Sequence, residues 1–77
     1  MSHITIYTKS GCPNCVTAKA LLKQHGMEYG ELDVEKDPDA LARLAPDQRQ
    51  MPQIFFKGER LGGLAGLREW IKWKAQQ

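Results

Sequence analysis

The sequence has no long apolar segment and no strong excess of either charge. Its net charge is +2, which is too small to indicate a nucleic-acid-binding protein. No apolar run approaches the roughly 18 residues that a membrane-spanning helix needs. The first residues contain neither a basic segment nor a long apolar stretch, so no secretory signal is visible. We therefore expect a cytoplasmic protein with neither a membrane nor a nucleic-acid partner.

Cysteine is equally scarce. The chain has two, Cys12 and Cys15, separated by Pro13 and Asn14. A disulfide between them would close a very small loop and could not hold distant segments together. Lasting structural disulfides are also rare in the cytosol. The pair therefore indicates redox chemistry or metal binding rather than a structural cross-link.

The 77 residues contain no repeat, no linker and no low-complexity segment, and 42% of them are hydrophobic. This composition is typical of a globular protein, and the length predicts a single domain over residues 1–77. Basic residues near the C-terminus are interpreted as a solvated face. They are Lys57, Arg60, Arg68, Lys72 and Lys74.

Hydrophobic periodicity and turn signals predict an α/β fold with the order βαβαββα. The elements cover residues 3–8, 13–25, 28–34, 38–45, 53–56, 60–62 and 64–74. Asp37 and Pro38 give the second helix its start signal, because Asp caps helices and Pro suits the first helical position. The first two strands should be parallel with a right-handed crossover. The hairpin adds antiparallel strands, which gives a four-stranded mixed sheet covered by three helices.

Cys12 falls at the N-cap of the first helix, with Pro13 at the first helical position. Free backbone N–H groups and the positive end of the helix dipole point at its sulfur. Both favour the thiolate, so we expect the pKa of Cys12 to lie below the usual value of about 8.5. Lys9 adds positive charge nearby. A thiolate is the nucleophile in disulfide exchange, and Cys15 is placed one turn later to attack the mixed disulfide that Cys12 forms.

Other interpretations of the cysteine pair stay open at this point. The two residues could be small buried hydrophobes or half of a zinc site. A zinc site needs four ligands, and the remaining candidates, His3 and His25, lack the usual paired spacing; we predict no metal site. Copper chaperones also carry Cys-x-x-Cys before a helix, but their element order differs from the one predicted here.

Three segments resemble glutaredoxins. Residues 7–15, Tyr-Thr-Lys-Ser-Gly-Cys-Pro-Asn-Cys, are similar to the family's active-site segment Tyr-[Ser/Thr]-Lys-x-x-Cys-Pro-Tyr-Cys. Residues 51–55, Met-Pro-Gln-Ile-Phe, resemble its Val-Pro-Gln-hydrophobic-Phe segment, and residues 61–67 resemble Ile-Gly-Gly-Cys-Asp-Asp-Leu. The segments occur in the family's order and span nearly the whole chain. The resemblance implies a thioredoxin-like fold and a dithiol thiol–disulfide oxidoreductase.

The resemblance also implies residue roles. Cys12 matches the nucleophile and Cys15 the resolving cysteine. Pro52 matches a proline whose peptide bond is cis, and Met51 matches the residue whose backbone binds the peptide part of glutathione. Lys9 matches a lysine that contacts a glutathione carboxylate. The other positions implied in substrate binding are Asn14, Gln48, Arg49, Gly62, Gly63, Leu64 and Ala65.

The sequence departs from the family pattern in two places. Asn14 replaces the usual tyrosine, and residues 64–66, Leu-Ala-Gly, replace Cys-Asp-Asp, so acceptors for the ammonium group of glutathione are missing. We expect a monomer without a tightly bound cofactor that uses glutathione weakly as co-substrate to reduce protein disulfides. The alternative is an electron donor of ribonucleotide reductase that thioredoxin reductase reduces. An iron–sulfur carrier is disfavoured by Pro13 and Cys15.

Overall fold

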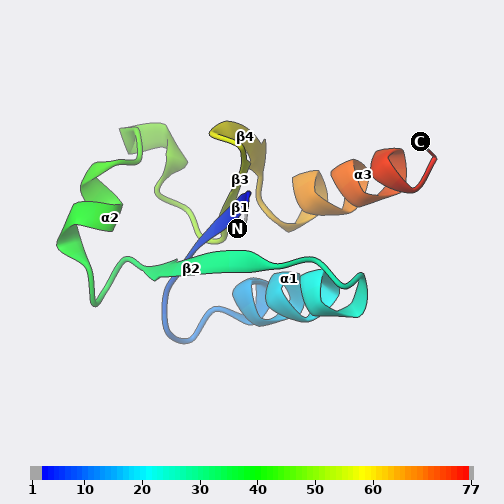
Figure 1. Ribbon diagram of the computed structural model, residues 1–77. Coiled ribbons are helices and arrows are strands. Elements are labelled where there is room, and N and C mark those ends of the chain that lie inside the picture. The colour runs from blue at the N-terminus through cyan, green and yellow to red at the C-terminus, as the bar shows by residue number, and fades with distance from the viewer. Residues whose placement is uncertain (1–2, 77) are drawn as a thin grey trace.

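A computed structural model describes residues 3–76 and contains one four-stranded mixed sheet (Figure 1). Its strands are β1 (Ile4–Thr8), β2 (Tyr29–Asp33), β3 (Gln53–Phe56) and β4 (Glu59–Gly62). The helices are α1 (Pro13–Gln24), α2 (Pro38–Ala42) and α3 (Leu64–Ala75), and a 3₁₀ turn covers Pro46–Gln48. Among residues 3–76, no helix has the length and apolar character that crossing a membrane requires.

The strand order is β2-β1-β3-β4, with β1 and β2 parallel and the other neighbours antiparallel. This confirms the predicted thioredoxin-like fold. Strand β1 is central, so its residues pair on both sides: Ile6 lies opposite Glu31 of β2 and opposite Ile54 of β3. A strand with neighbours on both sides and helices over it suits the β-branched residues that β1 carries.

Helices α1 and α3 cover one face of the sheet. The main core lies beneath them and consists of Ile4, Ile6, Ala18, Leu22, Ile54, Leu67 and Ile71. Leu67 and Ile71 are one turn apart on α3 and form its buried apolar stripe. Burial of this stripe fixes the start of α3 beside the end of β4.

A second, smaller cluster includes both cysteines. Cys12 and Cys15 pack there with Tyr7, Ala40, Leu44 and Met51. Because Tyr7 alternates with Ile6 along β1, it faces away from the main core, and Figure 1 shows α2 apart from α1 and α3. The redox pair therefore follows the end of β1 and belongs to this second cluster.

Two sequence expectations about helix ends were inaccurate. Helix α2 ends at Ala42, whereas the prediction extended it to the residue before Pro46. Leu44 is buried but follows the helix. The prediction was too long because Leu44 continues the apolar pattern of the helix although it lies in the loop. Helix α1 ends at Gln24, one residue earlier than predicted, and His25 is exposed and forms its C-cap. Gly26 follows in the left-handed region, with a φ of +66°, which is typical of a glycine after a helix end.

Candidate redox site

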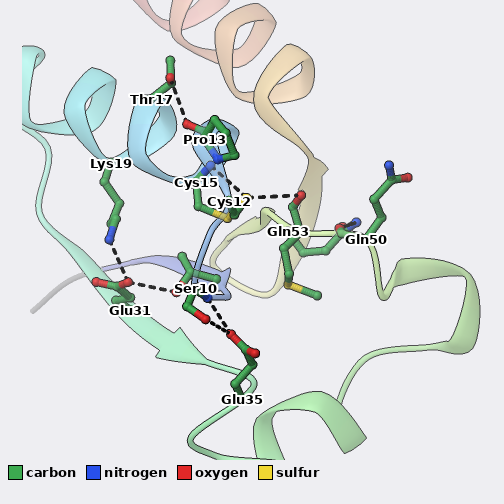
Figure 2. The surroundings of a disulfide bond; sticks show 12 residues. Ser10, Cys12, Pro13, Cys15, Thr17, Lys19, Glu31, Glu35, Gln50 and Gln53 are labelled. Carbon is green, nitrogen blue, oxygen red and sulfur yellow. Dashed lines mark hydrogen bonds and ion pairs between the residues drawn. A yellow bond between two sulfur atoms is a disulfide. The ribbon is translucent and has the colours of Figure 1, made fainter.

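Cys12 is the N-cap residue of α1, as predicted. Its extended backbone, with φ −107° and ψ 99°, directs the side chain back over the first turn. The backbone N–H of Cys15 donates to the Cys12 sulfur at 3.2 Å. The two cysteines form a disulfide with 5.3 Å between their Cα atoms (Figure 2). The structure is thus the oxidised form, in which the helix start holds the sulfur that sequence analysis assigns as the nucleophile.

The segment before β3 faces this sulfur. The Met51–Pro52 peptide bond is cis, and the Met51 carbonyl oxygen lies 3.7 Å from the Cys12 sulfur. The predicted cis bond opposite Cys12 is therefore confirmed. Met51 is buried beside the cysteines, so its backbone forms one wall of the site.

The loop that precedes Cys12 is anchored by a residue that sequence analysis missed. Glu35 accepts hydrogen bonds from the backbone N–H of Ser10 at 2.6 Å and from the Ser10 hydroxyl (Figure 2). The hydroxyl bond, followed by the backbone bond, lowers the pKa of Glu35 below its ordinary value of 4.5. The partners are 25 residues apart, and no local pattern in the sequence could have paired them.

A second carboxylate links α1 to β2 beside the site. Glu31 accepts from the Lys19 ammonium at 3.0 Å and from the buried Thr8 hydroxyl at 2.9 Å. These two hydrogen bonds, the one from Lys19 first, lower the pKa of Glu31 below its ordinary value of 4.5. Thr8 ends β1 and Lys19 lies on α1, so this group joins β1, α1 and β2 next to the cysteine loop.

An open pocket of about 290 Å³, which we call the redox groove, extends from Asn14, the residue before Cys15, to the start of α3. Its lining includes six residues expected from the resemblance: Asn14, Met51, Pro52, Gly63, Leu64 and Ala65. Three further lining residues were not anticipated: Gln50, Gln53 and Arg60. Arg60 is exposed, as expected for a solvated face, and it also lines the groove.

Four predicted binding residues lie outside this lining. Lys9 and Arg49 are exposed on their loops. Gln48 turns its side-chain oxygen toward the backbone N–H of Ala45, at 3.4 Å. Gly62 ends β4 with a φ of +104°, a conformation that glycine adopts without strain. Their roles toward a ligand stay predictions.

A buried glutamine connects the unanticipated residues. Gln53 is 4% exposed, and its side-chain N–H₂ donates to the Gln50 carbonyl oxygen at 2.8 Å. Its side-chain oxygen accepts from Arg60 Nε at 3.0 Å. Because Arg60 is seven residues away on the other strand of the hairpin, the pairing depends on the register of β3 and β4. Sequence periodicity does not specify that register.

Gly66, in the first turn of α3, contacts the backbone of β4. A Cβ atom at this position would overlap the carbonyl oxygen of Leu61. Ala65, the preceding residue, is exposed. Among residues 3–76, no cluster of three or more His, Cys, Asp or Glu side chains is placed to hold a metal ion.

A thioredoxin-like fold with a Cys-x-x-Cys disulfide at the start of its first helix defines a class of thiol–disulfide oxidoreductases. Comparison with known proteins specifies the family. The family model described as glutaredoxin matches residues 4–61, and the chain belongs to the glutaredoxin family. Members of this family are thiol–disulfide oxidoreductases, and this chain is accordingly one, with the redox disulfide between Cys12 and Cys15.

Individual relatives agree with this assignment. The chain is 43% identical over 65 residues to the probable glutaredoxin ssr2061 of Synechocystis sp., covering 80% of this chain and 74% of that protein. It is 39% identical over 67 residues to glutaredoxin 3 of Escherichia coli K12, covering 82% and 78%. The solution structure of glutaredoxin from Brucella melitensis superposes with a TM-score of 0.75 at 35% identity, covering 94% of this chain and 80% of that one.

Proposed function

We propose that this protein is a dithiol glutaredoxin that reduces protein disulfides and glutathione mixed disulfides, with Cys12 as nucleophile and Cys15 as resolving residue. One observation carries the assignment of roles. The Cys12 sulfur is the N-cap acceptor of α1 and lies 3.7 Å from the Met51 carbonyl oxygen, and Cys12 is 8% exposed against 2% for Cys15. Of the two cysteines, Cys12 is therefore the more accessible to a substrate disulfide.

The reaction proceeds in two exchanges. The Cys12 thiolate attacks one sulfur of the substrate disulfide, forms a mixed disulfide and releases the other sulfur as a thiolate, which takes up a proton. Cys15 then loses its proton and attacks the Cys12 sulfur, forming the Cys12–Cys15 disulfide and releasing the second substrate thiolate. The substrate gains two electrons and two protons, and the protein is oxidised to the state seen in the structure.

The wall opposite Cys12 supports binding of an extended peptide. The Met51 backbone lies next to the sulfur, and Pro52 follows without an N–H group of its own. A substrate segment can then pair with the Met51 backbone as an added strand does. Asn14 and Ala65 leave the groove open at either side, since both are small and line it.

Two electron sources fit the groove, glutathione and thioredoxin reductase. Leu64 and Ala65 line the groove at the start of α3 without contributing a carboxylate, which leaves the ammonium group of glutathione without an acidic partner there. We therefore propose weak use of glutathione as a co-substrate. A second candidate, reduction by thioredoxin reductase in the service of ribonucleotide reductase, is favoured by the same lack of acidic side chains.

A paired turnover assay tests the proposal. One reaction supplies glutathione, glutathione reductase and NADPH, and the other supplies thioredoxin reductase and NADPH; both use a small disulfide as substrate. We expect turnover with at least one system, none with Cys12→Ser, and a trapped mixed disulfide with Cys15→Ser, visible by mass spectrometry. Turnover that persists in Cys12→Ser would contradict the assigned nucleophile.

A further inference from the structure

Arg60 is the one charged side chain that lines the redox groove. The rest of the lining is neutral, with Asn14, Gln50 and Gln53 supplying its polar side chains. A guanidinium stays protonated at every accessible pH. The groove next to the reactive sulfur therefore carries a fixed positive charge with no carboxylate in the lining to neutralise it.

A hydrogen bond to a buried side chain orients the guanidinium. Arg60 Nε donates to the buried Gln53 oxygen at 3.0 Å, and the Gln53 amide is itself fixed by the Gln50 carbonyl oxygen at 2.8 Å. An arginine has five N–H donors in a planar fork, and this contact uses the one on Nε. Within residues 3–76, the terminal nitrogens of Arg60 form no hydrogen bond or ion pair. Those donors are available to a ligand in the groove.

We propose that Arg60 is a specificity-determining residue that binds a carboxylate on the group joined to Cys12 in the mixed disulfide. The planar fork matches a carboxylate through two parallel hydrogen bonds. The carboxylate could come from an Asp or Glu side chain beside the substrate cysteine, or from glutathione itself. The inference rests on the proposed function, because it concerns substrates that react at Cys12.

The expected preference is moderate. Charge-assisted hydrogen bonds in a buried site correspond to about 10-fold or more in affinity, but exposed ion pairs contribute far less. Arg60 is exposed overall while Gln53, which orients it, is buried. We therefore expect about a 5- to 10-fold preference for an acidic over a neutral neighbour of the substrate cysteine, and a lower rate with a basic neighbour.

A single-turnover experiment tests this without choosing a reductant. The reduced protein is mixed with disulfide-linked peptide dimers, acetylated and amidated at their ends, that differ only in Asp, Asn or Lys next to cysteine. Oxidation of Cys12 and Cys15 is followed by quenching with an alkylating reagent and mass spectrometry. A second arm compares glutathione disulfide with its carboxyl ester, so that the two sources of carboxylate are distinguished.

The ratio of rate constants on one variant separates recognition from a structural effect. For the wild type we expect the Asp peptide to react about 5 to 10 times faster than the Asn peptide. The ratio should fall to about 1 in Arg60→Gln and invert in Arg60→Glu. Arg43→Gln is the matched control, because Arg43 is exposed at the end of α2 and outside the groove lining; it should keep the wild-type ratio.

Each outcome has a defined meaning. If Arg60→Gln loses the rate difference between the Asp and Asn peptides, Arg60 binds carboxylates of protein substrates. If the variant loses only the rate difference between glutathione disulfide and its ester, Arg60 binds a carboxylate of glutathione. A wild-type ratio of 1 in both arms, or a preference that survives in Arg60→Gln, overturns the inference. Failure of every disulfide to oxidise the reduced wild type would instead refute the proposed function.

Discussion

The carbonyl oxygen of Leu61 occupies the space where a side chain at Gly66 would begin. The end of β4 and the first turn of α3 therefore approach as closely as their backbones allow. The glutaredoxin resemblance places an acidic pair at residues 65 and 66. This contact permits a carboxylate at Ala65, which is exposed, and excludes one at Gly66.

Gly66→Ala should destabilise the protein even though alanine is the better helix former. Replacing a helical glycine by alanine usually gains about 1 kcal/mol. Here the new methyl group overlaps backbone rather than a movable side chain, and overpacking of this kind costs typically 1–3 kcal/mol. We expect a net loss in the free energy of unfolding, measured by urea titration. Ala65→Gly is the control that tests helix propensity alone at the neighbouring position.

Ala65→Asp should increase activity with glutathione mixed disulfides. The new carboxylate would lie on the redox groove at the start of α3, where it can accept from the ammonium group of glutathione. Since the position is exposed, we expect a gain of up to about 10-fold in kcat/KM. Ala65→Asn keeps the size without the charge and should gain little. An equal gain in both variants would show that charge is not the limiting factor.

In the reduced protein, Cys12 should be alkylated at pH values below the ordinary thiol pKa of about 8.5. The helix start and the Cys15 N–H favour the thiolate, so the pKa of Cys12 should lie below about 8.5. The rate of iodoacetamide alkylation as a function of pH gives this value directly in the Cys15→Ser variant. A Cys12 that reacts only above about pH 8.5 would contradict the helix-end argument.

Acid should weaken the loop before Cys12. The pKa of Glu35 is lowered below 4.5 by the Ser10 hydroxyl and backbone N–H, so ionised Glu35 stabilises the fold above about pH 4.5. That contribution is lost as the pH falls through the lowered folded-state pKa. The free energy of unfolding of wild type should exceed that of Glu35→Gln at pH 7, and the difference should shrink below pH 4.5.

Glu69→Gln serves as the control for that comparison, because Glu69 is exposed on α3 and has no contact with Ser10. Its difference from wild type should not follow the same pH dependence. A Glu35→Gln difference that stays constant from pH 7 to pH 3 would show that Ser10 is not held by the ionised carboxylate.

Local signals in the sequence were sufficient for the element order and for the position of Cys12. A cap followed by proline, a left-handed Gly26 and alternating residues in β1 each depend on neighbours in the chain. Arg60 and Glu35 were missed because their partners are set by sheet register and loop closure over 7 and 25 residues. The end of α2 was misplaced for a related reason, since Leu44 reaches the core from outside the helix.

The Cys12 sulfur takes the place at the start of α1 that a serine or aspartate oxygen usually takes. A thiolate accepts the Cys15 N–H more strongly than a disulfide sulfur does. Folding and reduction form a closed thermodynamic cycle, so this preference contributes both to the free energy of unfolding and to the reduction potential. The reduced domain gains unfolding free energy over the oxidised one, and its reduction potential rises by the equivalent amount over an unfolded Cys-Pro-Asn-Cys peptide, about 30 mV for each 1.4 kcal/mol. Helix capping thus contributes to the reduction potential of the protein, and calorimetry and redox titration should return the same free energy.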